Sequence, residues 1–272
     1  MVILGLPALL AVLLACPPWA TMLLVCVIAG VAAYELLHTA APQAPVFVCG
    51  MTVAAAVLQT VYGYTGSTAL AVGAADAVTT VRWVFLMLLF LTAVVSHERG
   101  GTFTFPQLAA AVVGGIVFPA LYGCLYRLRC AGEFGRLYVL APFAVAFLGD
   151  TFSMYAGILF GKAKMAPRVS PHKTWAGFWC GPLGSAIGML LVGLLGVRWL
   201  GYAPVYWKLA AVGAFANLFG QLGDLSMSLI KREAGIKDYS RLFLEHGGML
   251  DRFDSTMFIL PVIWAFVSSG AI

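Results

Sequence analysis

The chain has 272 residues, of which 62% are hydrophobic and 10% are charged, and its formal net charge is +5 at pH 7. A soluble domain is only about 45–50% apolar, so this composition excludes a soluble globular protein. No Lys or Arg precedes Arg82, so the positive charge belongs to the later part of the chain. This distribution argues against a general nucleic-acid surface and for anionic ligands or anionic lipid.

Apolar runs close to the length that crosses a bilayer follow one another along the chain. They are continuously apolar, which favours helices over the alternating strands of a membrane barrel. We therefore predict an all-α polytopic integral membrane protein with about nine transmembrane helices. The predicted spans are residues 2–16, 19–37, 44–63, 80–96, 106–126, 136–160, 175–197, 205–230 and 254–271.

No linker or soluble segment interrupts the series, so we predict one membrane domain over residues 1–272. Within it, residues 1–135 form less characteristic N-terminal helices, and residues 136–272 form the catalytic helices and loops. Residues 2–15 resemble the apolar core of a signal peptide but lack its basic n-region, so we expect a retained helix. Residues 64–79 are small and mildly apolar and could add a partial helix.

Two basic loops indicate the orientation. Loop 161–174 holds four basic residues and no acid, and loop 231–252 is also rich in Lys and Arg. Two predicted spans separate the loops, so both lie on the same side, which the positive-inside rule assigns to the cytoplasm. We expect the active site in a polar cavity near the cytoplasmic face, and in a bacterium the membrane would be the inner one.

Two acids, Asp150 and Asp224, lie deep within predicted apolar spans. A carboxylate at the bilayer centre costs at least about 2.5 kcal/mol and normally faces a cavity, a partner or an ion. Asp224 also belongs to a polar stripe, because spacings of three and four residues place side chains on one helix face. The stripe consists of Asn217, Gln221, Asp224, Ser228 and Lys231. Hydrogen bonding between helices explains the two amides but not a carboxylate above a lysine, so the stripe predicts a functional site.

Asp251 and Asp254 stand three positions apart just before the last predicted span. If they begin its helix they share a face. Simple capping is the alternative and suits Asp254, but capping does not require two acids flanking Arg252. Together with Asp224 and Asp238, these acids offer oxygen ligands and no Cys/His cluster, which is the preference of Mg²⁺.

Cations and glycines accompany the acids. They are Lys231, Arg232, Lys237, Arg252 and the sequence His246-Gly247-Gly248. Glycines let backbone N–H groups approach an oxyanion closely. Carboxylates for a metal, cations for phosphates and a glycine turn are the parts of phosphoryl or nucleotidyl transfer. The alternative for the cations is the positive-inside signal with contacts to lipid headgroups.

A second cluster follows Asp150. It contains Lys162 and the segment Ser170-Pro171-His172-Lys173-Thr174, which we interpret as a rigid basic turn that starts the next helix. Ser170 and Lys173 could hold a second set of phosphate oxygens. His172 alone indicates nothing beyond a solvated loop.

The motif K-R-x4-K-D followed by H-G-G-x-L-D-R-x-D resembles the signature of the phosphatidate cytidylyltransferase family. S-P-x-K-T ahead of a Gly also resembles that family, and the similarity covers residues 149–177 and 219–256, with a short match at Ala33–Leu37. Ala176 stands where the family usually has Glu, and Ser226-Met227 stand where Phe-Glu is common.

The resemblance implies a homodimeric membrane enzyme that converts CTP and phosphatidate to CDP-diacylglycerol and pyrophosphate with Mg²⁺, and it implies no nucleic-acid partner. It places the metal ligands at Asp224 and Asp251, with or without a second, monovalent cation such as K⁺. On this hypothesis Asp224, Asp251, Lys231 and Arg252 are catalytic. The substrate-binding residues are then Ser170, Lys173, Lys162, Ser228, Arg232, Lys237, Asp238, His246, Gly247, Gly248 and Asp150.

Three alternatives stay open. The same chemistry could act on another lipid phosphate or use another nucleotide, because no segment indicates a base-specific pocket. A secondary transporter could also hold intramembrane acids, but it predicts inverted repeats and none is apparent. A catalytically inactive relative is favoured to a small degree by Ala176 and Met227.

Overall fold

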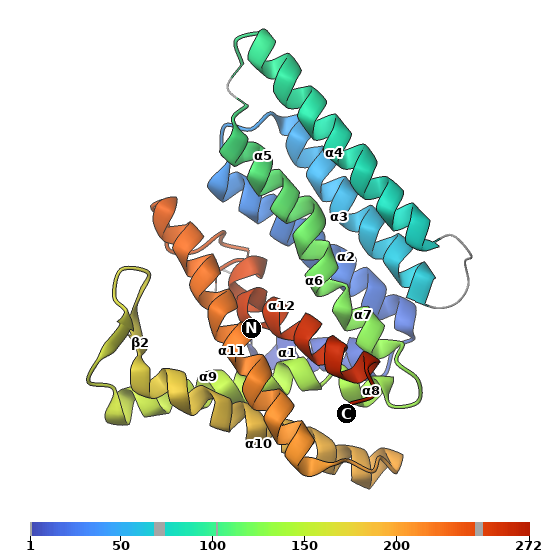
Figure 1. Ribbon diagram of the computed structural model, residues 1–272, viewed down its shortest axis with the longest axis vertical. Coiled ribbons are helices and arrows are strands. Elements are labelled where there is room, and N and C mark those ends of the chain that lie inside the picture. The colour runs from blue at the N-terminus through green and yellow to red at the C-terminus, as the bar shows by residue number, and fades with distance from the viewer. Residues whose placement is uncertain (1, 68–73, 102, 243–246) are drawn as a thin grey trace. The chain divides into compact units, whose positions relative to one another are not determined.

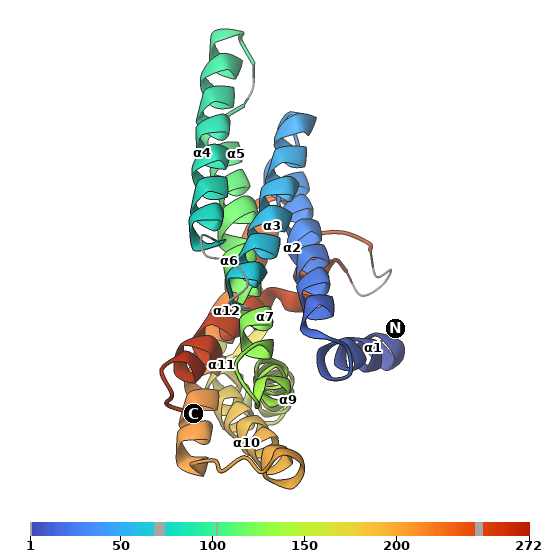
Figure 2. The same ribbon diagram turned by 90° about the vertical axis from the view of Figure 1, so that its right-hand side faces the viewer.

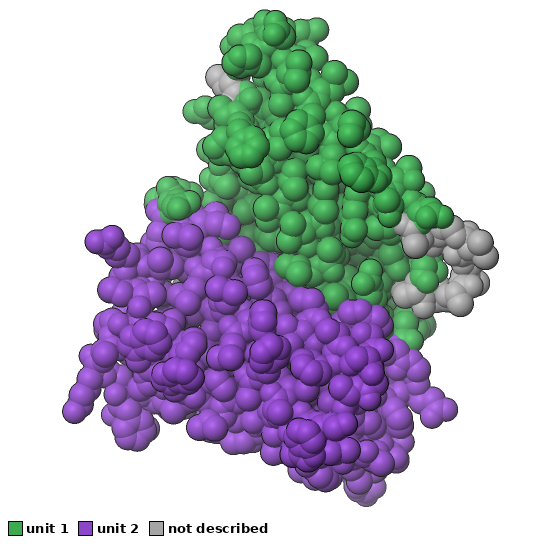
Figure 3. All heavy atoms as spheres, in the orientation of Figure 1, with its two compact units in different colours: residues 1–130, 233–252 green, residues 131–232, 253–272 purple. Residues whose placement is uncertain are grey.

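The computed structural model describes residues 2–67, 74–101, 103–242 and 247–272. The chain divides into two compact units that interleave along the sequence (Figure 3). Unit 1 comprises residues 1–130 and 233–252, and unit 2 comprises residues 131–232 and 253–272. The division near residue 130 lies close to the predicted change at 135/136. The assignment of residues 233–252 to unit 1 had no counterpart in the sequence argument, and the prediction of a single domain stays a prediction.

Unit 1 consists of helices up to residue 130. They are α1 (Val2–Leu14), α2 (Pro18–Ala40), α3 (Val46–Ser67), α4 (Ala74–Glu98), α5 (Phe105–Val112), α6 (Phe118–Tyr122) and α7 (Cys124–Arg129). Helix α3 packs against both α2 and α4, and α2 and α3 lie side by side in both ribbon views (Figure 1, Figure 2). Apolar side chains of α2 to α5 fill a buried core, which includes Leu37, Val48, Ala55, Phe85, Leu89, Leu108 and Ala111.

A π-helical turn, Val113–Val117, joins α5 to α6. Its glycine backbone lies close to neighbouring helices, since a Cβ on Gly115 would stand 2.6 Å from the Phe85 ring. The Gln59 side-chain amide donates to the Gly115 carbonyl, and Arg82 Nε donates to Gln59 Oε1 at 2.8 Å. The wider turn therefore keeps its carbonyl satisfied inside an apolar bundle, as membrane helices require.

Unit 2 is centred on the long helices α9 (Ala141–Phe160) and α10 (Trp175–Leu200), which pack side by side (Figure 1). Its elements are α8 (Gly135–Tyr138), α9 (Ala141–Phe160), β1 (Lys164–Ala166), β2 (Ser170–Thr174), α10 (Trp175–Leu200), α11 (Tyr206–Glu233) and most of α12 (Met249–Ser268). Glycines allow the close approach of α10 to α9: a Cβ on Gly188 would lie 2.7 Å from the Ala144 carbonyl. Ser185 Oγ adds a hydrogen bond to the Val145 carbonyl at 2.7 Å. Small residues and hydroxyls are the usual means of joining helices in a membrane.

The segment Ser170–Thr174, predicted as a rigid turn, is instead strand β2 of a hairpin with β1, so that prediction is wrong. The strands are antiparallel, with Lys164 opposite Thr174. Pro171 is tolerated because both strands of a two-stranded sheet are edges, where a missing amide hydrogen need not break a ladder bond. Thr174 Oγ1 then accepts the Gly177 amide at 3.2 Å and caps α10, which begins at Trp175 as predicted.

Within the described residues, six stretches are long and apolar enough to cross a membrane. They are Pro18–Ala40, Val46–Gly66, Asp76–Glu98, Phe105–Arg129, Gly135–Phe160 and Trp175–Leu200. Each overlaps a predicted span, and the all-α polytopic class is confirmed. The remaining predicted spans are helical as α1, α11 and α12, but they do not meet that criterion, so the count of nine stays a prediction. Of residues 64–79, the central part, 68–73, lies outside the described residues.

Candidate active site

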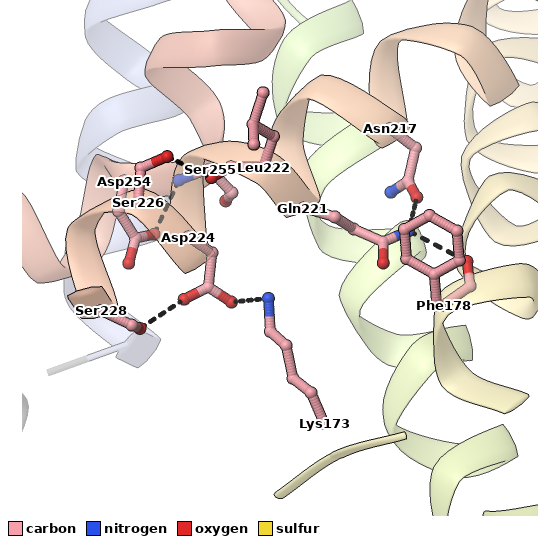
Figure 4. Close-up of polar contacts among 10 residues, drawn as sticks. All are labelled: Lys173, Phe178, Asn217, Gln221, Leu222, Asp224, Ser226, Ser228, Asp254 and Ser255. Atoms are coloured by element: carbon pink, nitrogen blue, oxygen red, sulfur yellow. Dashed lines mark hydrogen bonds and ion pairs between the residues drawn. The ribbon is translucent and has the colours of Figure 1, made fainter. Parts of the chain in front are cut away.

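The predicted polar stripe lies on α11, and its acid is engaged in an ion pair (Figure 4). Lys173 Nζ, from β2, lies 2.6 Å from Asp224 Oδ2. The side chains of Lys173 and Asp224 are 23% and 32% exposed, so the pair is partly buried. Ser228 Oγ donates to the other carboxylate oxygen of Asp224 at 3.3 Å. Asp224 of the polar stripe and Lys173 of the second predicted cluster thus lie together within unit 2.

The other end of the stripe joins helices. Gln221 Nε2 donates to Asn217 Oδ1 at 2.6 Å and to the Phe178 carbonyl of α10 at 3.1 Å (Figure 4). Asn217 and Gln221 are both buried. The amides therefore act as contacts between helices, the alternative given for them from the sequence, and a functional role for the stripe from Asp224 onward stays a prediction.

Two further carboxylates belong to the same electrostatic group. Asp150 on α9 interacts with Asp224 and Lys173, and Asp254 on α12 interacts with Asp224, Asp150 and Lys231. Asp254 Oδ1 also accepts the Ser255 amide at 2.7 Å (Figure 4). Lys231 is buried at 9% exposure. Three carboxylates thus interact with two ammonium groups, and a further cation would relieve the repulsion among the carboxylates.

The donor set of this cluster fits Mg²⁺ chemically, because it consists of carboxylate oxygens. Within the described residues, no group of three or more His, Cys, Asp or Glu side chains lies close enough to hold a metal ion. Mg²⁺ does not need such a group, since it commonly binds through one or two carboxylates together with substrate phosphates. The assignment of Mg²⁺ to Asp224 and Asp251 stays a prediction.

Asp251 lies in the first turn of α12, within unit 1. Its Oδ2 accepts the Gly248 amide at 2.9 Å and the Tyr239 amide at 2.8 Å. Helix α12 begins at Met249, earlier than the predicted 254, so the alternative of simple capping by Asp254 does not apply. Asp251 is the residue that reaches back to the amide before the helix, as the third residue of a capping box does. The carboxylate is consequently fixed in orientation by two backbone donors.

Glu35 is a buried acid that was not among the predicted site residues. It lies on α2 in unit 1, is only 2% exposed, and accepts hydrogen bonds from Ser240 Oγ at 2.6 Å, Met249 N at 3.0 Å and Leu250 N at 2.8 Å. An acid inside an apolar span was the available signal. Glu35 was not predicted as a site residue because it lies near the end of the predicted span 19–37, and a carboxylate at the end of a span can be solvated.

The remaining predicted residues are placed less distinctively. Arg232 Nε donates to the Val169 carbonyl at 3.2 Å and so links α11 to the hairpin. His246 lies outside the described residues. Ser170 is half-buried, Gly247 and Gly248 are buried, and the exposed members are Lys162, Lys237, Asp238 and Arg252. Their predicted substrate contacts stay predictions.

A family model described as "Cytidylyltransferase family" matches residues 1–269. The chain belongs to the cytidylyltransferase family. Among curated proteins, this family member is similar to the phosphatidate cytidylyltransferase of Staphylococcus saprophyticus, with 40% identity over 141 residues, 52% of each chain. The phosphatidate cytidylyltransferase of Staphylococcus epidermidis is 43% identical over 141 residues, again 52% of each chain. That of Staphylococcus haemolyticus is 42% identical over 129 residues, 47% of this chain and 48% of the relative. The chain thus spans about half the length of the curated relatives it matches.

Proposed function

We propose that this protein is a phosphatidate cytidylyltransferase, which converts CTP and phosphatidate to CDP-diacylglycerol and pyrophosphate. The supporting observation is the Asp224–Lys173 pair, set among Asp150, Asp254 and Lys231 on predominantly apolar helices. Family membership and the names of the similar proteins agree with this activity.

The proposed reaction is an in-line displacement. An oxygen of the phosphatidate phosphate attacks the α-phosphorus of CTP, the bond from that phosphorus to the β-phosphate oxygen breaks, and pyrophosphate leaves. The attacking oxygen is already anionic near neutral pH, so positioning and charge neutralisation matter more than proton removal. Bound Mg²⁺ supplies neutralisation of the phosphate oxygens.

The chain's own residues would position the substrates. Asp224 holds the Lys173 ammonium at 2.6 Å, so this cation is fixed before a phosphate arrives. Arg232 ties the hairpin that carries Lys173 to the end of α11, which limits the movement of that strand. Lys231, Arg252 and Lys237 are proposed to neutralise the remaining phosphate charge. Asp224 and Asp251 are kept as the proposed Mg²⁺ ligands.

The membrane location of the enzyme follows from its helices, and its finer features are part of the proposal. We assign it to the cytoplasmic membrane, with the hairpin and residues 233–252 on the cytoplasmic side. CTP is soluble and phosphatidate is a membrane lipid, so a site at that face meets both. A homodimer is proposed, and a second, monovalent cation is compatible with the cluster of acids.

The test is CMP transfer by the purified protein in detergent micelles. Labelled CTP and phosphatidate should give CDP-lipid and pyrophosphate in equal amounts when Mg²⁺ is present. Without Mg²⁺, neither product should form. Other nucleoside triphosphates and other lipid phosphates, supplied separately, define the substrate class. We expect Asp224→Asn to abolish turnover in a folded protein. Ser226→Ala is the matched control, because Ser226 lies on the same helix and its hydroxyl donates to the Leu222 carbonyl at 2.8 Å. Near-normal turnover in Asp224→Asn would contradict the assignment.

A further inference from the structure

Two carboxylates of unit 1 bind the same two backbone segments. Tyr239 N donates to Asp251 Oδ2, and the hydroxyl of the next residue, Ser240, donates to Glu35 Oε1. Gly248 N donates to Asp251 Oδ2, and the amides of Met249 and Leu250 donate to the Glu35 carboxylate. Each segment is therefore bound once by Asp251 and once or twice by Glu35.

The first turn of α12 requires an acceptor from elsewhere. An N-cap side chain normally accepts the amides at the start of a helix. Gly248 precedes the helix and has no side chain, so Glu35, a residue of α2, accepts the amides of Met249 and Leu250 instead. This is a long-range replacement for a local cap.

The glycines of the turn leave room for both carboxylates. Gly247 has φ +76°, a backbone conformation that favours glycine, and a Cβ there would lie 2.8 Å from Asp251 Oδ2. A Cβ on Gly248 would meet the Glu35 carboxylate. The Gly-Gly pair that the sequence argument assigned to a substrate phosphate thus accommodates two carboxylates of the chain itself.

We propose that Glu35 is a positioning residue for Asp251 in the proposed cytidylyl transfer. It fixes the segments that carry the two amide donors of Asp251, and so sets the direction in which that carboxylate presents itself to a cation. The inference rests on the proposed function, but the clamp on residues 239–240 and 248–250 can be measured independently of it. Residues that orient a metal ligand typically change metal affinity or activity about 10- to 100-fold when they are replaced.

Glu35→Gln is the decisive variant. A glutamine presents one acceptor oxygen and an NH₂ group, and the NH₂ group cannot accept either amide. We expect the Mg²⁺ concentration for half-maximal CDP-lipid formation to rise about 10- to 100-fold, while the KM for phosphatidate is unchanged. Ser240→Ala removes one of the three donors to the Glu35 carboxylate. It should raise this Mg²⁺ concentration as well, but by a smaller factor. Glu98→Gln, an exposed acid at the end of α4, should leave it unchanged.

Two further readouts do not depend on turnover. Amide hydrogen exchange at Met249 and Leu250 should be faster in Glu35→Gln than in Glu98→Gln. The rise in melting temperature produced by Mg²⁺ alone should be smaller in Glu35→Gln as well.

Unchanged exchange at the two amides would show that the clamp does not exist, and faster exchange with an unchanged Mg²⁺ response would show a merely structural role. Either result overturns the proposal. If the wild-type protein makes no CDP-lipid, the proposed function fails, but exchange and the Mg²⁺-dependent melting shift still decide the role of Glu35.

Discussion

The ion pair between Lys173 and Asp224 gives the sharpest quantitative prediction. Lys173→Met removes the ammonium group and keeps an unbranched side chain. Exposed ion pairs contribute about 0.2–1 kcal/mol, and removing one partner of a buried pair costs about 3–5 kcal/mol. With side chains 23% and 32% exposed, this pair lies between those limits, so we expect a loss of about 1–3 kcal/mol in unfolding free energy.

Substitution of Lys173 and substitution of Asp224 should not lower the unfolding free energy by the same amount. Lys173→Met leaves Asp224, Asp150 and Asp254 with less compensation, whereas Asp224→Asn removes a carboxylate that the other two repel. Asp224→Asn should therefore be the less destabilising change. The double variant should cost less than the sum of the single ones, because residues in one charge network are coupled.

The assay combines melting in detergent with CMP transfer. A loss of 1–3 kcal/mol corresponds to a fall of about 2–12 °C in melting temperature for a chain of this size. Turnover of the folded Lys173→Met protein should fall about 10²–10³-fold, the usual effect of losing a preorganised group that stabilises developing charge. Lys164→Met is the matched control, because Lys164 is exposed on the adjacent strand β1. If both lysine variants melt and turn over alike, the reasoning about the pair is refuted.

Two other substitutions test unit 1. Gly248→Ala should displace the Glu35 carboxylate and lower both melting temperature and CDP-lipid formation, whereas Gly50→Ala, with nothing within 4 Å of the added Cβ, should do neither. Equal melting temperatures and equal CDP-lipid formation in the two glycine variants would count against the close approach of Glu35 to Gly248. Gln59→Leu should lower unfolding free energy by about 1–3 kcal/mol, since it strands the Arg82 Nε donor and the π-helical carbonyl, while turnover of the folded protein is retained. A melting temperature equal to wild type would argue against that network.

The helices were predictable because each depends on a long run of neighbouring residues. The apolar runs predicted nearly every helix. The spacing of polar residues in α11 predicted that Asp224 and Ser228 share one face, and the two side chains are hydrogen-bonded. The hairpin was missed because the short basic segment with Pro171 has no strand periodicity. The start of α12 was missed because its glycines indicate a turn, and the compensating cap comes from another helix.

Pairings across the chain were beyond sequence reasoning. Asp224 was expected above Lys231, one or two turns along its own helix, but its ion-pair partner is Lys173 of β2. The donors to Glu35 come from residues 205 to 215 positions later. Neither partner leaves a local pattern, since contacts of this kind arise only when distant segments fold together.

The wide separation between Glu35 and its donors also bears on how the chain is made. Met249 is synthesised 214 residues after Glu35, and at roughly 5–20 residues per second this takes about 10–40 s. Throughout that interval α2 carries an acid whose native donors have not yet left the ribosome, and all of residues 131–232 are produced in between. Burying a carboxylate without partners is costly, so we expect the nascent protein to be more open to degradation before residue 250 is made. A nonsense mutation late in the reading frame should therefore destabilise the earliest helices, and not only remove the last one.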